Sequence, residues 1–170
     1  MKKLTAVFCS ILFATFSLSI YANIPQADKM NSDTQLLFVQ TAPTATIDKQ
    51  CDTKNICHTQ LVLNNVAPYM LMFTEGKPRI ASFIGNKDFI QQYYDKVGAS
   101  EKLNTALIAF QDDKTQQHVI TIKNPTYLAE KNEMVYDITF IKKTDVVADH
   151  QKLTNVAVFI DDVCAICVGP

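Results

Sequence analysis

Hydrophobic and polar residues alternate with a period of two through most of the chain, a pattern typical of β-strands packed on one face. The clearest example is MVYDITFIKK, in which Met134 and Tyr136 share one face and Asp137 lies on the other. Similar runs predict strands at QLLFVQT, HTQLVLN, YMLMFT, RIASFI, TALIAFQ, HVITIKN and LTNVAVFID, which are residues 35–41, 58–64, 69–74, 79–84, 105–111, 118–124 and 153–161. With the short ATID segment after Pro43, the pattern predicts up to nine strands.

Turn-forming residues separate these runs. Asn64-Asn65, the tight turn at residues 75–78, Asp112-Asp113-Lys114 and Asn132 are each expected to reverse the chain, because such residues accept the backbone angles of turns. Proline has no N–H to give to a sheet. We therefore expect Pro43 to interrupt the first strand and Pro125 to end the strand before it.

The period changes to that of a helix in NKDFIQQYYDKVG. Phe89, Ile90, Tyr93 and Tyr94 recur at helical spacing, which predicts one short helix at about 87–97 that Asn86 caps. Many short strands with one helix indicate a mainly β fold, an antiparallel β-sandwich with an immunoglobulin-like architecture at most.

The N-terminus has the pattern of a secretory signal peptide. Two lysines precede an uncharged run from Leu4 to Ile20, and the small residue Ala22 offers a cleavage point. The run of 17 residues is shorter than the about 20 of a spanning helix. We expect residues 1–22 to be a signal peptide cleaved after Ala22, residues 23–33 a disordered lead, and residues 34–170 a single domain in the periplasm or outside the cell.

Charge excludes one class of partner. Removal of the signal peptide takes two of the 16 basic residues and leaves 14 against 17 acidic residues, a net charge near −3. Nucleic-acid binding needs clustered Lys and Arg, and here the lysines alternate with acids. We expect no nucleic-acid partner and, because no further run is long enough to span a bilayer, no membrane contact after cleavage.

Four cysteines remain after cleavage, an even number typical of an oxidised, exported protein. Four cysteines allow three pairings. We favour the local pairs, Cys51 with Cys57 and Cys164 with Cys167, because each pair is close in sequence. Cross-pairing of the two segments remains an alternative, and it would close a larger loop.

A metal or redox site is the alternative use of these thiols. Cys57 and His58 would join Cys164 and Cys167 in a set suited to zinc or copper(I). The Cys-X-X-Cys pair resembles a thioredoxin-type motif, but only residues 168–170 follow it, too few for the helix that lowers a thiol pKa. The hypothesis also requires reduced thiols in an oxidising compartment, so His58 is only a weak metal candidate.

Catalytic patterns are weak elsewhere. None of the serines Ser32, Ser82 and Ser100 lies in a G-x-S-x-G sequence. The adjacent pairs Asp112-Asp113 and Asp161-Asp162 would point to opposite faces of a strand. We therefore favour a non-catalytic protein without a cofactor.

The candidate binding site is the turn after residues 69–74. Arg79 is the only arginine in the chain, and Glu75 lies across the turn from it. The simpler interpretation is a local ion pair of at most ~1 kcal/mol. The functional interpretation makes Lys77 and Arg79 an exposed docking point, because Arg suits bidentate recognition of anions. The apolar residues that precede the turn, Tyr69, Met70, Met72 and Phe73, are expected in the core.

Four segments carry a resemblance to a family of small exported bacterial proteins of unassigned function. They are FVQTA, LNNVAPYMLMFTEGKPRIASFI, IKNPTY and LTNVAVFIDD, within residues 36–162. The family's R-P-x-R block has Lys77 in place of its first arginine here, and Tyr94 or a neighbour stands in place of a helical tryptophan. The resemblance implies the fold and export; it brings no established catalytic residues and leaves the activity open.

Two hypotheses follow. The preferred one is a non-catalytic secreted or periplasmic module that binds a protein, glycan or small ligand through Glu75, Lys77 and Arg79. The alternative is a metal- or redox-dependent accessory protein centred on His58 and the four cysteines.

Overall fold

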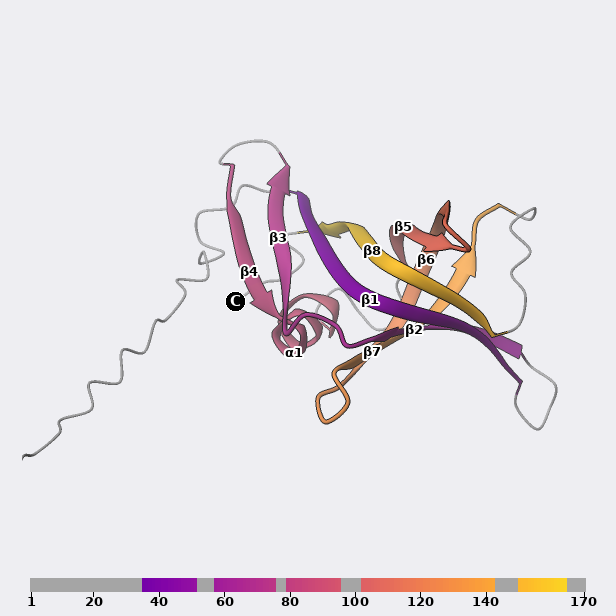
Figure 1. The fold of residues 1–170 in the computed structure, drawn as a ribbon. Coiled ribbons are helices and arrows are strands. Elements are labelled where there is room, and N and C mark those ends of the chain that lie inside the picture. The colour runs from indigo at the N-terminus through magenta and orange to yellow at the C-terminus, as the bar shows by residue number, and fades with distance from the viewer. Residues whose placement is uncertain (1–34, 52–56, 76–78, 96–101, 143–149, 165–170) are drawn as a thin grey trace, which may run out of the picture.

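The protein is mainly β, and its described residues include one short helical segment (Figure 1). The computed structural model describes residues 35–51, 57–75, 79–95, 102–142 and 150–164. The elements are β1 (Gln35–Cys51), β2 (Cys57–Asn64), β3 (Tyr69–Glu75), β4 (Ala81–Gly85), α1 (Asn86–Phe89), the π-helical turn η2 (Ile90–Tyr94), β5 (Leu103–Gln111), β6 (Lys114–Leu128), β7 (Glu133–Phe140) and β8 (Gln151–Cys164). No helix among these residues is long and apolar enough to cross a membrane.

All eight described strands belong to one antiparallel sheet in the order β2-β7-β6-β5-β8-β1-β3-β4. Because β2 also pairs with β1, six strands (β1, β2, β7, β6, β5 and β8) form a closed ring. β3 and β4 extend from the first half of β1 to one side of this ring (Figure 1). The prediction of a mainly β, antiparallel fold is confirmed. The hydrogen bonding joins the strands in one continuous sheet, so two separate face-packed layers are not confirmed.

The long strand β1 makes this closure possible. Its first part, up to Val39, pairs with β3, its second part, from Thr44, pairs with β2, and β8 lies along its other side. The prediction that Pro43 interrupts the strand is wrong. Pro43 lies where β1 changes partner from β3 to β2, a place that needs no N–H on that side.

Pro125 likewise lies within a strand and does not end it. β6 continues to Leu128, with a register shift against β7 between Lys123 and Thr126. Asn124, immediately before the proline, has a φ of 48°. A β-bulge of this kind accommodates a proline, because the strand loses no ladder hydrogen bond there.

The interior of the closed ring holds the apolar face of each strand. The predicted alternation of β7 is confirmed, since Met134, Tyr136 and Ile138 are all buried. Phe38 of β1 connects this core to the helical segment. Its ring lies 4.9 Å from that of Phe89 and 5.1 Å from that of Tyr93, both edge-on.

The predicted helix at about 87–97 is present as α1 and η2 from Asn86 to Tyr94, and residues 96 and 97 lie outside the described residues. The prediction that Asn86 caps the helix is wrong, because the Asn86 side chain makes no capping hydrogen bond. The side chain is instead buried, and it accepts a hydrogen bond from Gln40 Nε2 (2.9 Å) and donates one to the carbonyl of Ala67 (2.8 Å). The hydroxyl of Tyr136 donates to the other end of Gln40, at Oε1 (2.7 Å).

Candidate functional site

The two described residues of the predicted binding turn lie where the sequence places them. Glu75 ends β3, Arg79 lies just before β4, and both are exposed. Lys77 lies outside the described residues. The described contacts include no ion pair between Glu75 and Arg79, so the simpler interpretation gains no support. The base of the hairpin is fixed one residue further in, where the N–H of Ile80 donates to Thr74 Oγ1 (2.8 Å) and the N–H of Thr74 donates to the carbonyl of Ile80 (3.0 Å).

β4 is the last strand in the sheet order, so among the described strands none covers its outer edge. Its sequence, ASFIG, contains no charged residue and no proline. Native sheets usually protect an edge with charge, proline or a bulge, because an open edge pairs readily with another strand. The side chain of Phe83, at the centre of β4, is 64% exposed.

Phe83 begins a line of apolar side chains across the outer face of the sheet. The register places Phe83 opposite Leu71, and Leu71 opposite Val39. The line continues across three further strands. We call this set the apolar row; its members, one from each of six strands, are Phe83, Leu71, Val39, Phe159, Ala106 and Val119. Five strand spacings of about 4.8 Å give it a length of about 24 Å.

The members of the apolar row point away from the core. Each has a buried residue before or after it in its strand, and successive side chains on a strand point to opposite faces. Phe83, Ala106 and Val119 are exposed, and the three members between β4 and β5 are half-buried. The row is therefore one continuous apolar strip that no described element covers completely.

The apolar row is widest at the β3–β4 hairpin. Tyr69, on the same side of β3 as Leu71, is 60% exposed, and Phe73 on that side is half-buried. The prediction that Tyr69 lies in the core is wrong, because it alternates with Met70 and Met72, whose side chains fill the inner face. Exposed apolar patches of this kind commonly mark interaction surfaces.

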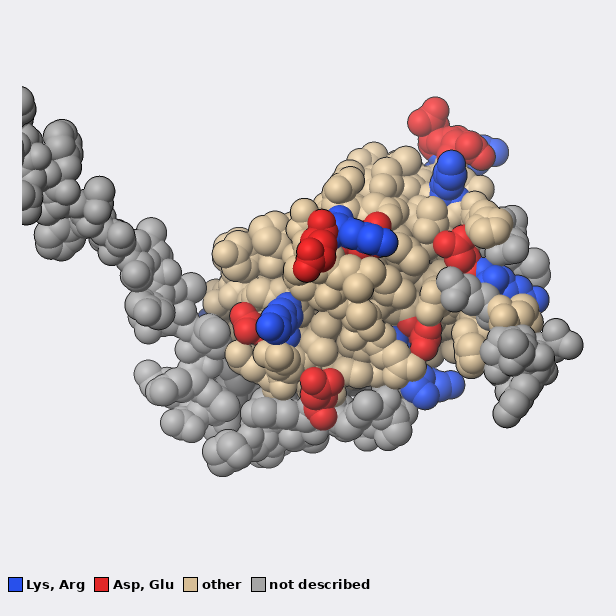
Figure 2. Space-filling view, turned by 90° about the horizontal axis from the view of Figure 1, so that it is seen from below, with Lys and Arg blue, Asp and Glu red and all other residues tan. Residues whose placement is uncertain are grey.

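On one face of the molecule (Figure 2), the described charged side chains show no comparable concentration. Acidic and basic residues are interspersed there over a largely uncharged surface.

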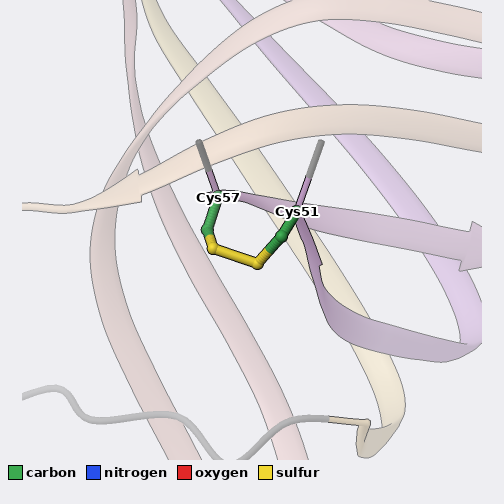
Figure 3. The surroundings of a disulfide bond; sticks show 2 residues. All are labelled: Cys51 and Cys57. Atoms are coloured by element: carbon green, nitrogen blue, oxygen red, sulfur yellow. A yellow bond between two sulfur atoms is a disulfide. The ribbon is translucent and has the colours of Figure 1, made fainter. Parts of the chain in front are cut away.

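The first predicted disulfide is present. Cys51, at the end of β1, and Cys57, at the start of β2, are register partners, and their sulfur atoms are bonded (Figure 3). This bond leaves no thiol in either residue for a cross-pairing with the C-terminal cysteines. Cys164 ends β8, its backbone opposite Gln35, and Cys167 lies outside the described residues, so the second pairing stays a prediction.

The metal hypothesis loses one of its ligands to this bond, because the sulfur of Cys57 is not a thiolate. His58 is exposed at the start of β2. Within the described ranges, no group of three or more His, Cys, Asp or Glu side chains converges as metal ligands do.

Sequence reasoning identified the hairpin but missed the apolar row. In the sequence, Leu71 and Phe83 are ordinary residues of the predicted strands. The signal that distinguishes them is the pairing of their strands, which brings six outward apolar residues into line.

Comparisons of the chain with protein-family models, characterised proteins and solved structures found no match. The resemblance to a family of small exported proteins therefore stays a prediction.

Proposed function

We propose that this chain is a non-catalytic secreted or periplasmic module that binds a partner protein, and that it takes an extended segment of the partner along the outer edge of β4. The observation that carries the proposal is the apolar row ending at the outer edge of β4, which no other described strand covers. Export rests on the N-terminal signal-peptide pattern and the even number of cysteines after it.

Addition of a partner strand would use the backbone groups and the exposed side chain at the outer edge of β4. An added strand takes its affinity from main-chain hydrogen bonds and its specificity from alternate side chains. It would lie about 4.8 Å from β4, which places one of its outward side chains beside Phe83. An apolar residue at that position would extend the apolar row by one strand.

Arg79 would set the orientation of the partner segment along β4. It is exposed just before β4, and Ala81–Gly85 carries no charge of its own. An acidic residue on the partner segment would pair with the Arg79 guanidinium, which suits a carboxylate geometrically. The expected partner segment is therefore extended, apolar at alternate positions and acidic at the end near Arg79.

A peptide library tests this proposal. We expect selection of displayed random peptides on the protein to enrich segments with alternate apolar residues and one acid. Phe83→Lys should abolish binding of the selected peptides, because the added charge would be buried without a partner. Ile141→Lys is the matched control, since Ile141 is 53% exposed and is not a member of the apolar row.

Three results would contradict the proposal. They are selected peptides without an apolar alternation, equal binding by the Phe83→Lys variant, or a stable dimer of the unliganded protein that Phe83→Lys dissociates. The last result would identify a second copy of the chain as the occupant of the edge.

A further inference from the structure

A second candidate site lies on strands at the other end of the sheet order from β4. A cleft of about 430 Å³ opens where the first residues of β2, the second half of β7 and the bulge of β6 meet. Lys102, immediately before β5, and Lys123 of β6 contribute to its wall, with His58, Thr59 and Thr139. Its volume falls in the range of small-molecule sites.

Lysines outnumber acidic residues among the described residues that line this cleft. Asp137 is the only acidic residue among the described residues that line it, and both of its oxygens accept hydrogen bonds from amide side chains. Gln60 Nε2 donates to Asp137 Oδ1 (3.1 Å), and Asn124 Nδ2 donates to Asp137 Oδ2 (2.8 Å). These two donors hold the carboxylate in place across three neighbouring strands.

The Asp137 carboxylate forms no described ion pair with either lysine. Lys123 is the register partner of Asp137, but the described part of the chain contains no ion pair of Lys123 or of Lys102. The lysines and aspartate among the described lining residues of the cleft are two ammonium groups and one carboxylate. This balance favours an anion, and an ammonium group binds oxyanions as a point charge.

The rest of the wall suits a polar molecule that carries hydroxyl groups. Thr59 and Thr139 offer hydroxyls, the imidazole of His58 offers a donor or an acceptor, and the half-buried ring of Phe140 provides one apolar surface. We infer that this cleft binds a monosaccharide-sized acid, with Lys102 and Lys123 on its oxyanion and the threonines and His58 near its hydroxyl groups.

The oxyanion of such a ligand is either a carboxylate or a phosphate. The inference does not depend on the proposed strand addition, because the cleft is built from β2, β6, β7 and Lys102, whereas the proposed docking edge is β4. Loss of one site should leave the other intact.

Amide chemical shifts followed by NMR test this site at constant ionic strength. The probes are glucuronate, glucose 6-phosphate and uncharged glucose. We expect saturable shifts at Lys123 and Thr139 with at least one of the two acids, and binding of glucose weaker by about tenfold or more. The stronger acid identifies the oxyanion as carboxylate or phosphate.

The variant Lys102→Ala/Lys123→Ala should weaken binding of that acid by about tenfold or more. Lys131→Ala is the control, because Lys131 lies in the β6–β7 turn and pairs with Glu133 (4.0 Å) away from the cleft. The single variant Lys102→Ala, at an exposed position, keeps the test decisive if the double variant does not fold. Absence of saturable shifts with both acids, equal binding of glucose, or unchanged binding by a folded lysine variant would overturn the inference.

Discussion

Gln40 Nε2 donates a hydrogen bond to Asn86 Oδ1 at 2.9 Å, and both side chains are almost fully buried. This bond joins the middle of β1 to the first residue of α1. Through Tyr136 on one side and the Ala67 carbonyl on the other, it forms a chain of polar contacts across the core. The helical segment is thereby fixed against the closed ring, close to the β3–β4 hairpin that the proposed function uses.

Removal of the Asn86 side chain from these polar contacts should lower the free energy of unfolding. Asn86→Ala leaves both Gln40 Nε2 and the Ala67 carbonyl without their partner, and an unsatisfied buried group costs about 1–3 kcal/mol. We expect the free energy of unfolding to fall by about 2–4 kcal/mol in urea denaturation. Gln117→Ala, at an exposed position of β6, should change it by less than about 0.5 kcal/mol. A loss for Asn86→Ala no larger than this control would show that the contacts do not stabilise the fold.

Alkaline pH should unfold the protein. Burial raises the pKa of Tyr93, Tyr94 and Tyr136, so these phenols keep their protons in the folded state at a pH where the unfolded chain loses them. The unfolded state then binds fewer protons, and stability is retained below about pH 10 and falls as the pH rises above it. The part of the tyrosinate absorbance that comes from these three phenols should appear together with the loss of the circular dichroism signal, because they ionise as the chain unfolds. Ionisation of all tyrosines at their ordinary pKa without loss of structure would contradict the prediction.

A glycine in the turn between β5 and β6 should stabilise the protein. Asp112 and Asp113 have φ values of 49° and 60°, a left-handed pair that favours Asn-Gly. Asp113→Gly should therefore raise the free energy of unfolding by about 0.5–1 kcal/mol, and Asp113→Ala should lower it. Thermal unfolding of the two variants measures this difference. The reverse order would exclude backbone conformation as the cause.

The Cys51–Cys57 disulfide should stabilise the β1–β2 hairpin. It closes a short loop, for which the chain-entropy model gives about 2 kcal/mol. We expect the Cys51→Ser/Cys57→Ser variant to lose up to about that amount in urea denaturation. Peptide mapping without reductant should recover the two cysteines in one linked fragment. A fragment with free thiols would contradict the bond.

Local features of the fold were predictable because neighbouring residues determine them. Alternation identified the inner face of β7, and Asn65, Asn132 and Asp113 all have the positive φ of the turns predicted for them. Closure of the sheet was not predictable, because it depends on the pairing of β1 with β8 and with β2, which no local pattern encodes. The passage of β1 through Pro43 follows from the same pairing.

The candidate site was predictable only in part. Glu75 and Arg79 were located from a turn signal and a unique arginine, and both lie exposed at the β3–β4 hairpin. Tyr69 was misplaced because adjacent residues in a strand cannot both face one core, and the sequence did not show which face is covered. Phe83 lacked any signal until β4 was known to be the edge of the sheet.

Amide hydrogen exchange of β4 tests the central claim most directly. A library-selected peptide should slow exchange in Ala81–Gly85, because its backbone would pair with the open edge, and Phe83→Lys should remove this protection. Protection confined to other strands, with exchange in β4 unchanged while the peptide is bound, would contradict strand addition at this edge.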